Sequence, residues 1–345
     1  MRRILLSLFA LAISGCGQES PPSETEISAE SEFAEIGLPE AAPSRAETLD
    51  GSPPLIIAHR GASGELPEHT LAAYERAIDQ GADFIEPDLV MTKDGVLIAR
   101  HDRYLSTTTD VADRPEFADR KRVAASPFVD REDWWAEDFT LAEIKTLRAT
   151  QPFEGRPIQF DGLFEVPTFD EVLALAVARG VGVYPETKAP SHHASVGLDM
   201  VEPMVEALSR SDFAAAEIPV FVQSFEPGIL RELKKRGDWP LVQLISADRA
   251  TIAAGLEPPL DAIAEYAAGV GPNKLFLWDA EGGRSDFVER AHGLGLLVHA
   301  WTYRDDSVAE GYADIQAELA ATFDQGVDGV FVDFPETAFD YRSGR

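Results

Sequence analysis

Short apolar runs alternate with longer amphipathic stretches from residue 53 to the end of the 345-residue chain. Eight such runs are rich in Val, Ile, Leu and Phe, which is typical of buried strands. They are residues 55–59, 84–90, 181–186, 220–223, 241–245, 275–278, 296–301 and 327–332. Helical periodicity separates most of them, for example over residues 70–80, 169–178, 196–208 and 313–323. Because strands that alternate with helices form parallel sheets, the pattern predicts an α/β fold, a closed TIM-type (β/α)8 barrel.

One further strand-like run, residues 96–101, follows the second run too closely to be a barrel strand. A crossover between parallel strands needs a dozen or more residues. We therefore expect this run to return antiparallel, as a β-hairpin with a turn at residues 93–95. That pairing would bring His101 back beside Glu86 and Asp88.

Residues 103–166 contain no clear barrel element. They include a basic run at residues 120–122 and the pair Trp134-Trp135. A connection of this length in a barrel is usually functional or forms a subdomain. We interpret it as an insertion after the second strand that lies over the mouth of the barrel.

The N-terminal segment, residues 1–16, has the features of a targeting peptide. Arg2 and Arg3 precede an apolar stretch, residues 4–13, that is too short to span a bilayer. The following Ile-Ser-Gly-Cys resembles a bacterial lipobox, in which Cys16 would be lipidated; an ordinary signal peptide is the alternative. The mature protein would then be exported, anchored to a membrane by acyl chains alone and facing the periplasm.

Residues 17–52 form the predicted tether between this anchor and the barrel. They hold nine acidic residues and one basic residue, with much Ser, Pro and Ala, and such a composition does not order itself. Gly17 stands where aspartate often retains a lipoprotein at the inner membrane, which favours the outer membrane. The predicted catalytic domain is therefore residues 53–345.

Charge and cysteine content exclude two further classes. The chain has 60 acidic and 30 basic side chains, a formal net charge of −30, so phosphate repulsion argues against nucleic acid as a partner. The only cysteine excludes a disulfide framework. Most of the carboxylates are expected on a solvated surface.

Polar side chains gather where the predicted strands end, which is where parallel barrels have their active sites. Glu86 and Asp88 alternate along one strand and therefore point the same way, with Glu186 on another strand. Three converging carboxylates require a cation, and oxygen ligands suit Ca²⁺ or Mg²⁺. The alternative is that they form structural ion pairs with Arg60 and Lys188.

Two histidines, His59 and His101, flank this predicted metal site. A histidine pair can act as base and acid in a displacement at phosphorus, while Arg60 and Lys188 hold the phosphate oxygens. His69 is interpreted as part of a helix start. Three further residues, predicted to bind substrate or else to pack in the barrel, are Gln223, Phe225 and Trp301.

Seven motifs resemble the glycerophosphodiester phosphodiesterase family, and its periplasmic branch above all. They are HRGASG at 59–64, LPEHT at 66–70, EPDLVMTKDG at 86–95, HD at 101–102, ETK at 186–188, QSF at 223–225 and DGVFVDFP at 328–335. The resemblance spans residues 53–340. One departure is Pro87, where the branch commonly has a polar residue. Proline removes a backbone donor, so we expect a local irregularity in this strand.

The resemblance implies a barrel that hydrolyses glycerophosphodiesters, such as glycerophosphocholine and glycerophosphoethanolamine, to sn-glycerol 3-phosphate and an alcohol. It implies that His59 and His101 are the acid–base pair and that Arg60 and Lys188 bind phosphate. It also implies one divalent cation, calcium in most members of the branch, on Glu86, Asp88 and Glu186. Attack on phosphorus by the substrate's own glycerol hydroxyl or by water remains open.

Two other functions are compatible with the sequence. A phospholipase-type phosphodiesterase would need an apolar, membrane-facing rim, which Phe128, Trp134 and Trp135 could supply. A surface lipoprotein that binds a partner without catalysis is the second alternative. The intact set of histidines and carboxylates argues against it, because a binding scaffold has no need of them.

Overall fold

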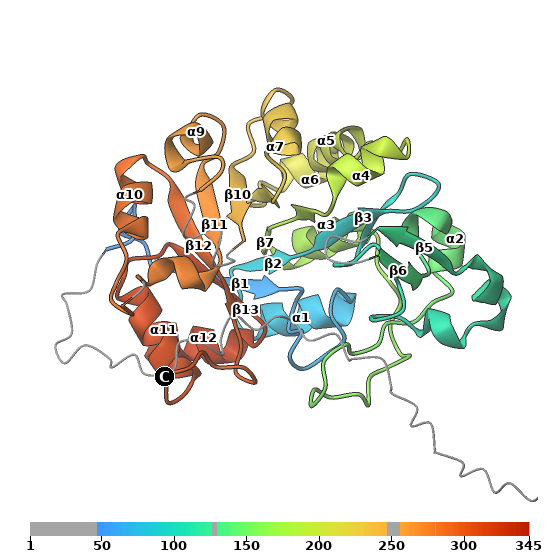
Figure 1. Ribbon diagram of the computed structural model, residues 1–345, viewed down its shortest axis with the longest axis horizontal. Helices are drawn as coiled ribbons and strands as arrows, with labels where there is room; N and C mark the ends of the chain where they lie inside the picture. The colour runs from blue at the N-terminus through green and yellow to red at the C-terminus, as the bar shows by residue number, and fades with distance from the viewer. Residues whose placement is uncertain (1–46, 126–129, 247–255, 280, 345) are drawn as a thin grey trace, which may run out of the picture.

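The computed structural model describes residues 47–125, 130–246, 256–279 and 281–344, and its centre is a barrel of parallel strands (Figure 1). Apolar residues fill both the barrel interior and the layer between strands and helices. The strands of the barrel are β1 (Leu55–His59), β2 (Phe84–Glu86), β3 (Asp88–Met91), β7 (Gly182–Val183), β8 (Glu186–Thr187), β9 (Val222–Ser224), β10 (Leu241–Ile245), β11 (Gly269–Pro272), β12 (Leu297–Tyr303) and β13 (Gly329–Val332).

The barrel closes because two of its strands are broken and continue on the far side of the break. The hydrogen-bonded order is β4-β3-β8-β9-β10-β11-β12-β13-β1-β2-β7. Pro87 separates β2 from β3, and β2 pairs with β7 while β3 pairs with β8, all in parallel. Strands β2 and β3 are two parts of one barrel strand, and β7 and β8 are two parts of the next one. Both ends of the hydrogen-bonded order therefore contain parts of the same two strands, which closes the sheet. The predicted (β/α)8 barrel and the irregularity at Pro87 are confirmed.

The predicted return strand is confirmed as well. Strand β4 (Leu97–Ala99) pairs antiparallel with β3, with Leu89 opposite Ala99. The turn between them contains Gly95, which has a φ of 82°, a left-handed conformation that glycine adopts without steric cost. The chain therefore returns to the mouth of the barrel directly after β4, at His101.

Helices cover the outside of the barrel. They are α1 (Leu71–Asp79), α3 (Phe169–Arg179), α4 (Pro190–Ser195), α5 (Val201–Ser209), α6 (Ser211–Ala215), α7 (Pro227–Lys234), α9 (Leu260–Ala264), α10 (Phe287–Gly293), α11 (Ile315–Phe323) and α12 (Pro335–Ser343). Thr70 caps α1, and Thr168 forms a capping box with Glu171 at the start of α3. The helix predicted over 196–208 begins only at Val201, because a separate short helix, α4, precedes it.

One predicted strand is wrong. Residues 275–278 are not a strand; residues Lys274–Leu277 form a 3₁₀ helix whose first turn is capped by the Asn273 side chain. The barrel strand at this place is β11, which carries two glycines. A side chain at Gly271 would lie 2.6 Å from Leu244, so close packing selects glycine there against strand propensity.

The insertion over residues 103–166 has a small core of its own beside the barrel (Figure 1). It contains a two-stranded antiparallel sheet, β5 (Arg122–Ala125) and β6 (Asp130–Asp133), and helix α2 (Leu141–Ile144). Trp134 and Trp135 are 8% and 0% exposed, so the apolar rim predicted for a phospholipase is not formed by them. Phe128 lies outside the described residues.

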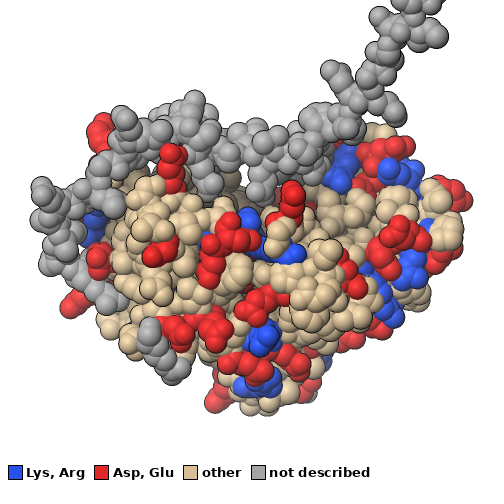
Figure 2. Space-filling model, turned by 90° about the horizontal axis from the view of Figure 1, so that it is seen from below, with Lys and Arg blue, Asp and Glu red and all other residues tan. Residues whose placement is uncertain are grey.

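The charged surface is mixed in sign. Figure 2 shows acidic and basic side chains side by side over much of one face. Elsewhere on the described surface, charged side chains form ion pairs such as Arg236 with Glu202 and Lys235 with Glu232. Among the described helices none is long and apolar enough to cross a membrane. Cys16, the signal segment and residues 17–46 of the tether lie outside the described residues.

Candidate active site

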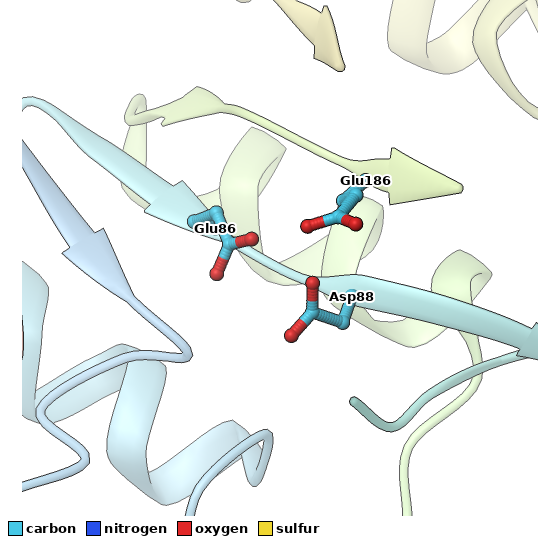
Figure 3. A group of neighbouring side chains, drawn as sticks. All are labelled: Glu86, Asp88 and Glu186. Carbon is cyan, nitrogen blue, oxygen red and sulfur yellow. The ribbon is translucent and has the colours of Figure 1, made fainter. Parts of the chain in front are cut away.

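Three buried carboxylates meet at the carboxyl ends of the strands (Figure 3). Glu86 is the last residue of β2, Asp88 the first of β3 and Glu186 the first of β8. One oxygen atom from each lies within 4.8 Å of the others, and the carboxyl groups turn toward one another. The structure therefore brings together the three residues that the sequence predicts as metal ligands.

The breaks in the two strands place these carboxylates. Pro87 and Pro185 have no N–H to donate, but their carbonyl groups accept hydrogen bonds from Glu186 and Gln223, both at 2.9 Å. Each strand therefore stays attached to its neighbour across the break. Glu86, Asp88 and Glu186 are consequently held on rigid backbone rather than on a loop.

Arg60 and Lys188 contact the carboxylates directly. The Nε atom of Arg60 lies 3.3 Å from Asp88, and its backbone N–H donates to a carboxyl oxygen of Glu86 at 2.9 Å. Arg60 has a φ of 61°, a conformation that costs a residue with a side chain roughly 1–2 kcal/mol. The Nζ atom of Lys188 lies 2.9 Å from Glu186 and 3.6 Å from Asp88.

The pKa values of the three carboxyl groups are driven apart. Burial, and then the charges of Asp88 and Glu186, raise the pKa of Glu86 well above its usual range. Burial also raises the pKa of Glu186 to about 8, although Lys188 acts against it. Burial opposes ionisation of Asp88 too, but Lys188 and a hydrogen bond from His69 outweigh it and hold its pKa well below the usual value.

The cluster fits a divalent cation. One buried oxygen of Asp88 and one of Glu186 accept no hydrogen bond from any described residue, and Lys188 approaches them only as an ion partner. All of the converging ligand atoms are carboxylate oxygens, which hard cations such as Ca²⁺ and Mg²⁺ prefer. Bringing such ions close to Glu86 and Glu186 would favour their charged forms.

The two predicted catalytic histidines each donate to an aspartate. The Nδ1 atom of His59, at the end of β1, lies 2.7 Å from Asp333, which follows β13. The Nδ1 atom of His101, just after β4, lies 3.0 Å from Asp102. An ionised carboxylate only accepts hydrogen bonds, so Nδ1 carries the proton in both rings and Nε2 is the free nitrogen.

The three predicted substrate residues lie at the ends of β9 and β12. Gln223 is buried and donates to Glu86 at 3.0 Å. Phe225 is 38% exposed and packs edge-on against Trp301, with ring centroids 5.8 Å apart. Trp301 donates its indole N–H to the carbonyl of Gly271 at 2.7 Å. Gln223 thus supports the carboxylates, while the ring of Phe225 lies beside Lys188, 5.7 Å from its Nζ atom to the ring centroid.

Sequence reasoning did not foresee several buried partners of the site. His69, interpreted as part of a helix start, is fully buried and lies 3.0 Å from Asp88, with Tyr74 on its other nitrogen. Burial lowers the pKa of His69 to about 4, so it is neutral and donates to Asp88. Glu68 binds Arg60 at 2.9 Å. The sequence held one signal for Glu68 and His69, because both lie in the motif LPEHT at residues 66–70.

A closed barrel with carboxylates, cations and histidines at the carboxyl ends of its strands is a TIM-barrel enzyme. Residues 59–337 match the Glycerophosphoryl diester phosphodiesterase family, and the chain belongs to this family. It is 36% identical to glycerophosphodiester phosphodiesterase GDPD6 of Arabidopsis thaliana, over 88% of this chain and 90% of that protein. It is 31% identical to glycerophosphodiester phosphodiesterase of Haemophilus influenzae, over 87% of this chain and 92% of that protein. The chain is thus an enzyme of the glycerophosphodiester phosphodiesterase class.

Solved structures of the same family share the fold. One is a phosphodiesterase of Oleispira antarctica in complex with the product sn-glycerol-3-phosphate, with a TM-score of 0.60 and 22% identity over 86% of this chain and all 100% of that one. A second, from Silicibacter pomeroyi, has a TM-score of 0.64 and 22% identity over 85% and 94% of the two chains.

Proposed function

We propose that this enzyme hydrolyses glycerophosphodiesters such as glycerophosphocholine and glycerophosphoethanolamine to sn-glycerol 3-phosphate and an alcohol, and that it depends on a divalent cation. The observation that carries the proposal is the buried carboxylate cluster of Glu86, Asp88 and Glu186, with one histidine–aspartate pair at the end of β1 and another just after β4. Ca²⁺ is the preferred ion, with Mg²⁺ as the alternative. When bound, the ion neutralises charge that develops on the phosphate oxygens.

His59 and His101 are the proposed acid–base pair. Burial, aided by the neighbouring Arg60, lowers the pKa of His59, so its free Nε2 is unprotonated and suited to accept a proton. His101 is more exposed, with 32% of its side chain accessible, which suits delivery of a proton to a departing alcohol. Arg60 and Lys188, largely buried at the mouth, would bind the phosphate oxygens.

We further propose that the substrate's own glycerol hydroxyl attacks phosphorus. His59 takes the hydroxyl proton as the new P–O bond forms, the bond to the alcohol breaks, and His101 protonates the released oxygen. Water then opens the cyclic phosphate with the roles reversed, which yields sn-glycerol 3-phosphate. This route is proposed because the site contains a pair of histidines. Trapping the cyclic phosphate would support it, whereas rapid turnover of a substrate without the neighbouring hydroxyl would show direct attack by water.

The proposed function is tested by release of sn-glycerol 3-phosphate from both substrates in Ca²⁺, Mg²⁺ or EDTA. We expect turnover with cation, most with Ca²⁺, and none after chelation. Glu186→Gln should require far more cation, whereas Glu318→Gln should not; Glu318 is an equally buried carboxylate that pairs with Lys274 at 2.6 Å outside the site. Full activity in EDTA, or preference for intact phosphatidylcholine, contradicts the proposal.

The export of the protein is a separate proposal that rests on the sequence alone. We propose that residues 1–16 are removed, that Cys16 is lipidated and that residues 17–52 tether the barrel to the outer membrane on its periplasmic side. Cys16→Ser should release the protein from membrane fractions while the soluble barrel remains active. Retention of the variant in membranes would contradict lipid anchoring.

A further inference from the structure

Arg156 connects the insertion to the histidine at the end of β1. Its side chain is only 2% exposed, although it lies on an irregular segment between α2 and α3. One terminal nitrogen donates to Asp333 at 2.5 Å, on the carboxyl oxygen that His59 does not use. Asp333 therefore lies between His59 and Arg156, with one oxygen bonded to each.

The guanidinium group of Arg156 is itself held from several sides. It donates to both carboxyl oxygens of Asp306, at 2.7 and 3.2 Å, and to the carbonyl of Ser63 at 3.3 Å. It lies over the ring of Phe153, 4.3 Å from the centroid. Asp306 follows β12 and Ser63 follows β1. One arginine thus ties the insertion to three different loops at the mouth of the barrel.

Asp333 needs such a partner because it is a buried charge. It is 2% exposed, and an unpaired carboxylate in that position is unfavourable. Burial raises its pKa, but His59 and Arg156 together outweigh this effect and hold the pKa well below its usual range. His59 is close to neutral, so the permanent charge nearest to Asp333 is that of Arg156; Arg304 also approaches the carboxylate, but only to 3.7 Å.

We propose that Arg156 is a positioning residue for catalysis: it fixes Asp333 so that His59 keeps its Nδ1 proton and presents Nε2 to the substrate. The insertion is then part of the catalytic apparatus rather than a decoration of the barrel. This inference rests on the proposed role of His59. It assigns to Arg156 no contact with the substrate.

The test compares Arg156→Gln, Arg156→Lys and Asp333→Asn, with Arg342→Gln as the matched control. Arg342 also forms an ion pair, with Asp83, and donates to the carbonyl of Pro54, but it lies on α12 outside the site. We expect Arg156→Gln to lower kcat about 10- to 100-fold with KM unchanged, as for other partners of catalytic groups. Arg156→Lys keeps the positive charge but not the planar guanidinium group, so its kcat should lie between that of the unaltered enzyme and that of Arg156→Gln.

The decisive measurement is the double variant of Arg156→Gln and Asp333→Asn. If Arg156 acts through Asp333, the double variant turns over as slowly as Asp333→Asn alone, because the two effects are not independent. Three results would overturn the inference. The losses in kcat of the two single variants could multiply in the double variant, Arg156→Gln could raise KM alone, or its loss in kcat could be no larger than that of Arg342→Gln. Should Arg156→Gln fail to fold, Arg156→Lys in the same cycle carries the test.

One further variant separates this inference from the proposed function. If His59→Ala turns over at a near-normal rate, the proposed role of His59 fails and Arg156 has nothing to position. If His59→Ala is slow while both Arg156 variants are normal in kcat, the proposed function stands and only the role of Arg156 is wrong.

Discussion

The two histidine–aspartate pairs of the site are built in opposite ways. His59 and Asp333 are 274 positions apart in the chain, and their side chains are 18% and 3% exposed. His101 and Asp102 are adjacent, and their side chains are 32% and 26% exposed. The first pair depends on the closed barrel and on a buried arginine, whereas the second is set by the local chain.

This difference suggests that the two histidines do different work. A half-buried ring whose aspartate partner is held by Arg156 keeps one tautomer and stays neutral, which suits a base. A more exposed ring with a neighbouring carboxylate can exchange protons with solvent between turnovers, which suits an acid that must be reloaded. On the proposed mechanism, the enzyme would combine one rigidly held and one accessible proton-transfer group at the mouth of the barrel.

The largest expected effect is the loss of either histidine. His59→Ala and His101→Ala should each lower kcat by about 10²–10⁴, the usual contribution of a general acid or base. His292→Ala is the matched control, because His292 also pairs with an aspartate, Asp328 at 2.9 Å, at the opposite end of β13. Steady-state release of sn-glycerol 3-phosphate measures all three. Near-normal kcat in either site variant would remove that histidine from the mechanism.

The next effect contrasts the two aspartates. Asp333→Asn should lower kcat about 100-fold, because an amide can offer its NH₂ group to His59 and favour the wrong tautomer, as in other histidine–carboxylate pairs. Asp102→Asn should cost only about 10-fold, because solvent can replace this more exposed partner. Parallel kcat values at saturating cation make the comparison. Equal losses would show that burial does not distinguish the two pairs.

A smaller effect concerns cation binding and pH. Without a cation the pKa of Glu186 is raised to about 8, so this carboxyl group holds a proton at neutral pH, and burial raises the pKa of Glu86 in the same direction. Binding of Ca²⁺ should therefore release protons and should weaken as pH falls from 8 to 6. Calorimetry of Ca²⁺ binding in buffers of different ionisation enthalpy counts the protons. Binding without proton release would refute the raised pKa values.

The smallest expected effect is on stability. A carboxyl group with a raised folded pKa stabilises the protein fully below its unfolded pKa and loses that contribution as pH rises through the folded value. For Glu186 this window runs from about pH 4.5 to about 8. Buried His69, whose pKa is lowered from 6.5 to about 4, acts in the opposite direction below pH 6.5, so Tm of the cation-free protein should fall between pH 6.5 and 8. Asp102, whose pKa the charge and hydrogen bond of His101 lower to about 2 against the effect of burial, acts with the opposite sign. Its stabilisation is lost only as pH falls from about 4 to 2.

Two control measurements sharpen the stability comparison. Saturating Ca²⁺ should abolish the fall in Tm between pH 6.5 and 8, because the ion takes the place of protons at Glu86 and Glu186. Asp102→Asn should flatten the decline in Tm between pH 4 and 2 without changing the behaviour above pH 4.5. A Tm of the cation-free protein that rises between pH 6.5 and 8 would contradict the raised pKa of Glu186.

Local sequence was sufficient for much of the framework. Apolar runs predicted most barrel strands, because a buried parallel strand needs an almost continuous apolar face. The connection between the second apolar run and residues 96–101 is too short for a parallel crossover, so it predicted the antiparallel strand β4. Pro87 predicted the break in the strand next to Glu86. The E-P-D spacing and the ETK motif were enough to predict the carboxylate cluster that the barrel assembles.

Tertiary structure alone decided the rest. Strand β11 was not predicted because its two glycines have low strand propensity. Glycine is needed there because Leu244 and Leu297 approach the backbone closely. Asp333 and Arg156 became partners of His59 only when the barrel closed and the insertion folded back, because no local pattern links residues so distant in the chain. Local rules act over one turn or one strand, so they predicted that His101 returns to the site on an antiparallel strand but could not predict the pair His59-Asp333.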